Sequence, residues 1–196
     1  FRYTAAMSQE DASEQARVMG VEYHNLPIEM VFKAFESTLA PLFAGKQPDV
    51  TEENLQARIR GVLLMALSNK LGSLLLATSN KSETAVGYAT LYGDMAGAFS
   101  PLKDVYKTLV YRLATYRNSL GAVPVIPERV ITRPPSAELA PGQVDQDSLP
   151  PYEVLDEILR RFMELDEPLE SIVAAGFARE TVRRVVNLVL LNEYKR

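Results

Sequence analysis

Cysteine and tryptophan are absent from this sequence, and histidine occurs once, at His24. Without cysteine, disulfides, thiolate nucleophiles and cysteine-based zinc sites are excluded, and a single histidine argues against a Ser-His-Asp triad. Any chemistry therefore has to use Asp, Glu, Lys, Arg, Asn and hydroxyl side chains.

An excess of positive charge and long apolar runs are also missing. The 21 Lys and Arg residues are balanced by 25 Asp and Glu residues, for a formal net charge of -4. This balance disfavours nucleic acid as a partner, because such binders need a basic surface for the phosphates. The longest apolar runs, such as Leu74–Ala77 and Leu188–Leu191, are far shorter than a membrane span, and Phe1 does not open a signal peptide. We expect a soluble, cytoplasmic protein with no membrane partner.

The sequence has enough apolar residues for one globular domain. Hydrophobic residues make up 47% of the 196 positions. Apolar residues repeat at helical spacing after Thr51, a candidate cap, up to Gly72, and in Tyr152–Leu165 and Ala178–Tyr194. Two more helices are expected, at Ser8–Met19 and Leu102–Tyr116.

Short apolar segments between these helices predict strands. Leu74–Ala77 is typical of a buried parallel strand that turns directly into a helix, and Val21–Ile28 is expected to be extended. Val123–Thr132 fits a short strand or a helical turn. The proline-rich stretch Arg133–Pro151 has no period, so it is expected to be a functional lid or a disordered loop. The alternation predicts an α/β domain with a mainly parallel sheet and flanking helices.

The segment from Thr78 to Glu83 follows the carboxyl end of the predicted strand. Ligands of open α/β sheets bind at this end, where the next helix offers free backbone amides. Asn80 and Glu83 also have the spacing of a capping box. A structural role for Glu83 therefore stays open beside a ligand-binding role.

Other side chains have types that suit an anionic or polar ligand. Asn54 and Arg58 share one helix face and could grip a ligand together, or they form a solvated flank. Lys107 lies near the start of a helix, where the dipole does not favour a cation, so a bound anion would help to explain it. An ordinary exposed lysine is the alternative. The Ser136 hydroxyl follows two prolines and could meet a phosphate or simply belong to a turn.

Several segments, taken together, resemble the NAD synthetase family. Asn80–Gly97, NKSETAVGYATLYGDMAG, is similar to the signature stretch of the family, and Asn54–Gly61, NLQARIRG, to the helix before it. Ile126–Leu139, IPERVITRPPSAEL, resembles the segment before its mobile loop. Two further segments match, Asp145–Tyr152, DQDSLPPY, and Asn192–Arg196, NEYKR. Their residues are most similar to those of the glutamine-dependent branch of the family.

The resemblance implies a fold, an assembly and a reaction. The fold is that of the PP-loop ATP pyrophosphatases, similar to adenine nucleotide alpha hydrolases, with residues 1–196 as one synthetase domain. The assembly is a homodimer. In the reaction, ATP adenylates the nicotinate carboxylate of deamido-NAD with loss of pyrophosphate, and ammonia from glutamine or free ammonium then displaces AMP to give NAD.

The resemblance also implies roles for individual residues, with ATP as co-substrate and Mg²⁺ as cofactor. Glu83 and Lys107 would be catalytic, with Glu83 holding magnesium near the reacting end of the substrate. ATP contacts would come from Thr78, Lys107 and Ser136. Deamido-NAD contacts would come from Asn54, Arg58, Glu83, Tyr88, Asp94 and Lys195, with Gly93 in the same region.

The sequence departs from the pattern of the family. The SGGxDS loop, which cradles the ATP pyrophosphate and whose aspartate binds magnesium, is not present, and Phe1–Ala12 resembles the segment after it. The basic tail beyond NEYKR and the glutaminase domain of the longer branch, with its cysteine nucleophile, are not present either. Ala98 stands where shorter members often have an acid, which leaves the substrate contact there in doubt.

These departures leave different readings open. One is an active ligase that has lost its phosphate loop, and the other is a catalytically inactive fragment that binds nucleotide or dimerises. We expect the chain alone to be inactive. Another ATP pyrophosphatase, such as GMP synthetase, fits less well because the GDMAG and NEYKR segments speak against it.

Overall fold

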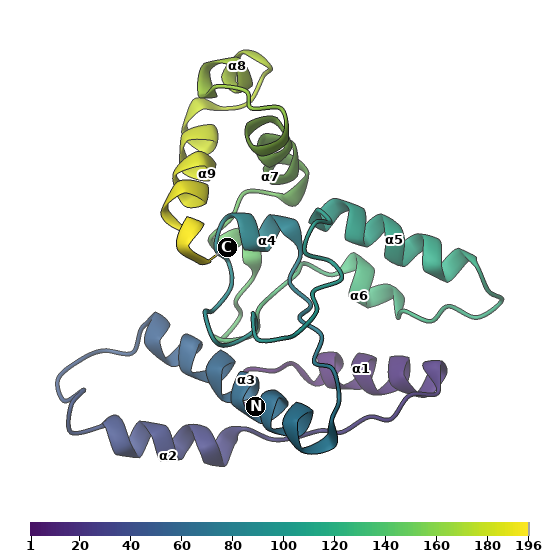
Figure 1. Cartoon of the computed structure of the whole chain (residues 1–196), viewed down its shortest axis with the longest axis vertical. Helices are drawn as coiled ribbons and strands as arrows, with labels where there is room; N and C mark the ends of the chain where they lie inside the picture. Colours follow the sequence, from purple (N-terminus) through teal and green to yellow (C-terminus); the bar gives the residue numbers. More distant parts are fainter. Residues whose placement is uncertain (196) are drawn as a thin grey trace.

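The computed structural model describes residues 1–195, so the final residue of the NEYKR segment lies outside the described residues. Helices dominate the architecture (Figure 1). The α-helices are α1 (Ala6–Met19), α2 (Glu29–Leu39), α3 (Val50–Leu71), α4 (Lys81–Ala85), α5 (Lys107–Ser119), α6 (Glu128–Thr132), α7 (Tyr152–Leu159), α8 (Leu169–Ala174) and α9 (Arg179–Leu191). The π-helical turn Arg160–Glu164 prolongs α7, and 3-10 turns lie at Asp145–Asp147 and Glu193–Lys195.

The predicted helices at α1, α3, α7 and α9 are confirmed, with corrected ends. Helix α3 is capped by Asp49 rather than by Thr51, because the Asp49 carboxylate accepts the Thr51 N–H at 2.7 Å and Glu52 completes the capping box. Gly72 ends the helix with a φ of 66°, a left-handed conformation that favours glycine.

Elsewhere the helix predictions need correction. The helix predicted at Leu102–Tyr116 begins only at Lys107 and runs to Ser119. The residues before it form turns, and Val105 O accepts the Lys81 N–H at 2.9 Å, which ties this segment to α4. Of the alternatives for Val123–Thr132, the helical turn is confirmed as α6. Helices α2 and α8 were not among the predictions.

The predicted parallel sheet is not confirmed. Leu76 forms a single parallel bridge with Phe99, and no strand occurs among residues 1–195. Leu74 and Leu76 are 65% and 50% exposed, so this segment is not the buried strand that its apolar run predicts. Val21–Ile28, which carries His24, also forms no strand. A strand needs a neighbour along its edge to satisfy its backbone groups, and these segments have at most one bridge of that kind.

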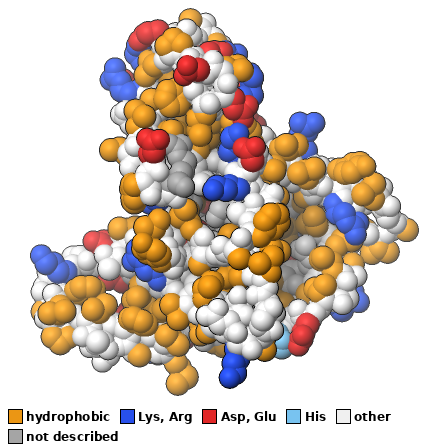
Figure 2. All heavy atoms as spheres, in the orientation of Figure 1, with side chains coloured by type: hydrophobic (Ala, Val, Ile, Leu, Met, Phe, Trp, Pro, Cys, Tyr) orange, Lys and Arg blue, Asp and Glu red, His pale blue; other side chains and the backbone are white. Residues whose placement is uncertain are grey.

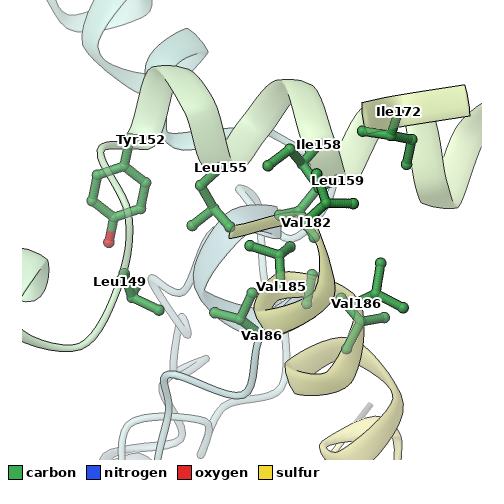
Figure 3. Close-up of a cluster of buried hydrophobic side chains, with 12 residues drawn as sticks. Val86, Leu149, Tyr152, Leu155, Ile158, Leu159, Ile172, Val182, Val185 and Val186 are labelled. Atoms are coloured by element: carbon green, nitrogen blue, oxygen red, sulfur yellow. The ribbon is translucent and has the colours of Figure 1, made fainter. Parts of the chain in front are cut away.

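The main hydrophobic core lies between α4, α7, α8 and α9 (Figure 3). Leu155, Ile158 and Leu159 of α7 are fully buried against Val182 and Val185 of α9. Their spacing of three and four residues puts them on one face of each helix. This core fixes α4 and α7, and through them the polar side chains of the site.

A smaller hydrophobic cluster joins α2 to α3. Its buried members are Ile28, Phe32 and Ile59. The same two helices carry exposed apolar side chains, among them Val62 at 67% and Leu71 at 68% exposed, and apolar atoms are prominent on this part of the surface (Figure 2). Within the described residues, no helix has both the length and the apolar character that a membrane span requires.

Candidate functional site

A cavity of about 740 Å³ lies between α3, the segment around Leu75–Thr78, the turns from Gly87 to Ala96 and the loop around Ala137–Gln143. Several predicted site residues come from stretches far apart in the sequence and meet on its wall. They are Asn54, Thr78, Tyr88, Gly93, Asp94 and Lys195.

The wall formed by α3 depends on small residues. A Cβ atom on Gly93 would lie 2.8 Å from the Cβ of Ala57, and one on Gly61 would lie 3.0 Å from the carbonyl oxygen of Tyr92. Only glycine lets the backbone approach this closely. The turn that carries Asp94 therefore lies directly against α3.

Thr90 connects this turn to the helix. Its hydroxyl donates to Asn54 Oδ1 at 2.8 Å, and its N–H donates to Asp94 Oδ1 at 2.6 Å. Asn54 and Asp94 are therefore held in place on the cavity wall. Arg58 is not on the wall, since it is exposed and its Nε donates to the Leu91 carbonyl at 3.2 Å. The structure does not bring Asn54 and Arg58 to one cavity.

Arg60 is the arginine that α3 presents to the cavity, and the sequence predictions do not include it. Burial lowers the pKa of its guanidinium, although the charges of Asp94 and Glu138 act in the opposite direction. No local signal in the sequence marks Arg60, because the approach of the turn to Ala57 and Gly61 on this part of α3 is a tertiary contact.

Glu83 and Lys107 form an ion pair and are not among the residues that line the cavity. One carboxylate oxygen, Oε2, accepts the Asn80 N–H at 3.4 Å, while Asn80 Oδ1 accepts the Glu83 N–H at 3.0 Å, which confirms the capping box. The other oxygen, Oε1, accepts from Lys107 Nζ at 2.8 Å. Burial lowers the pKa of Lys107, but the charge and hydrogen bond of Glu83 and further negative charge outweigh it, so the pKa is raised.

Asp145 and Tyr152 lie beside this ion pair. The Tyr152 hydroxyl donates to Asp145 Oδ2 at 2.7 Å, and the Lys107 ammonium lies 5.4 Å from the centre of the Tyr152 ring. Burial and the Asp145 carboxylate raise the pKa of Tyr152 and of Tyr88, so both phenols stay neutral. Within residues 1–195, the buried Oδ1 of Asp145 has no hydrogen-bond partner.

Ser136 lies in a folded loop and not on the cavity wall. Its hydroxyl donates to the Gln143 carbonyl and accepts the Glu138 N–H at 3.0 Å. Gln143 also accepts the Leu139 N–H at 2.9 Å, and the buried Gln56 of α3 donates to the Leu139 carbonyl at 3.0 Å. The loop predicted at Arg133–Pro151 is therefore irregular but anchored to α3.

Lys195 holds the turn before Thr90. Its ammonium donates to the carbonyls of Gly87 and Ala89 at 2.8 Å and 2.9 Å, and Asn192 donates to the Val86 carbonyl at 3.1 Å. Gly87 has a φ of 70°, and a Cβ there would lie 2.1 Å from the Asn192 side chain. Asn192 and Lys195, which follow α9, thus fix the backbone on both sides of Tyr88.

The donor set for a metal ion is sparse in the part of the chain that the structure describes. No group of three or more His, Cys, Asp or Glu side chains gathers there. Magnesium is often bound by one or two carboxylates together with substrate phosphates and water. Glu83 is one carboxylate of the kind that such a site uses, and both of its oxygens accept hydrogen bonds here, from the Asn80 N–H and the Lys107 ammonium.

The helical architecture and the cavity belong to a known class of protein. The model of the NAD synthase family matches residues 2–196, so the chain belongs to this family. Among curated proteins, it is 59% identical over 195 residues to the glutamine-dependent NAD(+) synthetase of Xanthomonas campestris pv. campestris. That alignment covers 100% of this chain and 35% of the relative, so the chain spans about a third of the curated relative's length.

Solved structures agree with this assignment. The glutamine-dependent NAD+ synthetase of Acinetobacter baumannii, solved in complex with ADP, is 55% identical with a TM-score of 0.66, over 99% of this chain and 34% of that one. The NMN synthetase of Francisella tularensis has a TM-score of 0.81 at 23% identity, over 100% and 72% of the two chains, and supports the fold alone. The fold is that of the NAD and NMN synthetases.

Proposed function

We propose that this chain is the synthetase part of a ligase that uses ATP to amidate deamido-NAD to NAD through an adenylated intermediate. Ammonia would come from glutamine or from free ammonium. The observation that carries the proposal is the cavity of about 740 Å³, whose wall includes Asn54, Tyr88 and Asp94, with the negative charge of Glu83 acting on the last two. Family membership and the ADP complex of a relative support a nucleotide substrate.

The proposed reaction needs fixed positive charge more than a strong base, because crowded negative charge develops on the phosphates. Lys107 would supply that charge, and its raised pKa keeps it protonated. Thr78 would contact ATP, and Ser136 would contact a phosphate after exchanging its bond to the Gln143 carbonyl. Magnesium at Glu83 would supply further neutralisation of the phosphates when bound.

Deamido-NAD would occupy the cavity. Tyr88 would offer an aromatic face to the pyridine ring, with Asn54, Asp94 and Lys195 as polar contacts on the wall and Arg58 as a contact outside it. Since ammonia is a nucleophile once deprotonated, holding it beside the adenylate would supply much of the second step. This reading does not require the single histidine, His24, which is exposed.

The proposal extends to the protein as a whole. We propose that the enzyme is cytoplasmic and that residues 1–196 form one synthetase domain. We also propose that its fold has a mainly parallel sheet of the ATP pyrophosphatase type, which includes the Leu76–Phe99 bridge. A glutaminase domain on the full-length chain would supply ammonia. The sequences of relatives named glutamine-dependent NAD(+) synthetases, which are about three times as long as this chain, support that arrangement.

We also propose a homodimer, because α2 and α3 carry apolar side chains that the described chain leaves uncovered. Met30 is 84% exposed, and Val62 and Leu71 are 67% and 68% exposed. Sedimentation at micromolar concentration should show a dimer, and Val62→Glu should shift it towards monomer. A clean monomer for the unaltered chain would contradict this part of the proposal.

The alternative is a catalytically inactive fragment that keeps the fold and binds nucleotide or dimerises. The 196-residue chain should then make no NAD from deamido-NAD, ATP and ammonium above background. Robust turnover by this chain would contradict the fragment reading and leave the active ligase.

The central test replaces Glu83 by Gln in the full-length enzyme with its phosphate loop. The amide can still accept the Asn80 N–H, so the capping box and the stability should survive. The substitution removes the negative charge that faces Lys107 and that would face magnesium. Turnover should therefore fall about a hundredfold, or ~3 kcal/mol in the barrier, and the magnesium requirement should rise.

A matched control is available in α3. Glu52 completes the other capping box, where its Oε2 accepts the Asp49 N–H at 2.7 Å. Glu52→Gln should leave turnover unchanged. Near-normal turnover and magnesium dependence in Glu83→Gln would return Glu83 to a purely structural role and remove the magnesium site.

A further inference from the structure

Two buried polar side chains lie beneath the Glu83–Lys107 pair. Asp156 of α7 is 6% exposed and Ser82 of α4 is 0% exposed. The Ser82 hydroxyl donates to Asp156 Oδ1 at 2.5 Å and accepts the backbone N–H of Lys107 at 2.9 Å. Asp156 Oδ2 accepts the backbone N–H of Thr108 at 2.8 Å. The two side chains thus satisfy the first two N–H groups of α5.

Helix α5 depends on this arrangement because it has no cap of its own. Tyr106, at the N-cap position, makes no capping hydrogen bond with its side chain. The first N–H groups of a helix have no partner within the helix, and negative charge is favourable there. A carboxylate buried this deeply also needs partners, and both Asp156 oxygens have one. The need is mutual, so the contact fixes α5 against α4 and α7.

We infer that Asp156 and Ser82 are positioning residues that hold Lys107 opposite Glu83. Ser82 directly precedes Glu83 in the sequence, and Thr108 directly follows Lys107. One hydrogen-bond network therefore sets the backbone at both ends of the 2.8 Å ion pair. The consequence for ATP binding rests on the proposed function, which assigns Lys107 to the phosphates. The positioning itself does not depend on that assignment.

Amide hydrogen exchange tests the network without any ligand. In Asp156→Ala the Thr108 amide should exchange roughly tenfold faster or more, and in Ser82→Ala the Lys107 amide should do the same. Asp156→Asn should retain most of the protection, because its oxygen can accept from Thr108 and its amide can donate to Ser82. Unchanged protection in both Asp156→Ala and Ser82→Ala would overturn the inference.

A second buried acid provides a matched control. Asp11 of α1 is also 6% exposed and accepts from Arg129 at 2.6 Å, in a network that does not include Lys107. Asp11→Asn should lower thermal stability without altering exchange at Lys107 or Thr108.

Nucleotide affinity tests the consequence, measured as ADP binding by calorimetry in the full-length protein. Asp156→Ala and Ser82→Ala should each weaken ADP binding by about tenfold, whereas Asp156→Asn should stay within about threefold and Asp11→Asn should match the unaltered protein. If Asp156→Ala does not fold, Ser82→Ala carries the same comparison.

The outcomes separate this inference from the proposed function. Lower stability with unchanged ADP affinity in both Ser82→Ala and Asp156→Ala would overturn the consequence for nucleotide binding, and the exchange rates at Lys107 and Thr108 would still decide the positioning. If the unaltered protein does not bind ADP, the proposed function fails, and the exchange rates at Lys107 and Thr108 alone decide whether the network holds Lys107.

Discussion

The region around α7 and α9 and the region around α2 and α3 are packed to different degrees. The first encloses fully buried side chains such as Leu155 and Val185, and the second buries only a small cluster around Phe32 while Leu71 stays 68% exposed. The cavity lies where α3 of the second region meets turns held by the first. The region around α7 and α9 therefore supplies rigidity. The region around α2 and α3 supplies one wall of the cavity and an uncovered apolar surface.

The sharpest test of this comparison is the same substitution made in both regions. Leu155→Ala should destabilise the protein by about 3 kcal/mol, because it opens a cavity in a core where the side chain has no exposed surface. Leu71→Ala, at 68% exposure, should change stability by less than about 0.5 kcal/mol in the monomer. Chemical denaturation measures both, and similar losses would mean that the two regions are equally packed.

A smaller effect is expected where the two regions meet. Gly93→Ala should cost about 1–3 kcal/mol, because the new Cβ would lie 2.8 Å from that of Ala57 and push the turn away from α3. Gly121→Ala is the control, since its new Cβ would have only one neighbour, at 3.7 Å, and the backbone there needs no glycine. Thermal melts of the two variants should differ clearly. Equal melts would mean that the turn can move without cost.

The smallest effect concerns the ion pair, whose contribution to stability disappears at alkaline pH. Since the folded pKa of Lys107 lies above its ordinary value of 10.5, its contribution to stability is fully present below that value and is lost as the pH rises through the folded pKa. The stability difference between the unaltered protein and Lys107→Met should therefore shrink as the pH rises above 10.5. Lys70→Met, at the exposed end of α3, serves as the control. A difference that stays constant over this range would contradict the raised pKa.

The same contrast explains which elements the sequence predicts. In α9, Val182, Val185 and Val189 are buried at helical spacing, so periodicity located the helix. In α3, Ile59 is buried but Val62 is exposed. The apolar pattern therefore predicted the helix but not which of its faces packs against the rest of the protein. The apolar run Leu74–Ala77 predicted a buried strand, yet Leu74 and Leu76 are exposed, because a sheet depends on neighbouring strands that a local pattern does not specify.

The site was predictable where the motif is local. Asn80 and Glu83 form the capping box that their spacing predicts, and the resemblance marked Asn54 and Asp94, which reach the cavity. Arg60 and Asp156 were missed, because only tertiary contacts between helices and turns make them part of the site. Ser136 was marked for its hydroxyl, but its contact with Gln143 depends on how a loop without any period folds back on itself.

The π-helical turn at Arg160–Glu164 makes chain length critical in one place. Such a turn holds one residue more than an α-helical turn, and each helical residue rotates the chain by about 100°. Before it, Leu159 faces the core, and at its end Glu164 reaches Lys81 at 2.7 Å. A single-residue deletion here would rotate everything that follows, so that the core contact and the ion pair could not both form. This stretch should not accept such a deletion, and its length is the feature to compare among relatives.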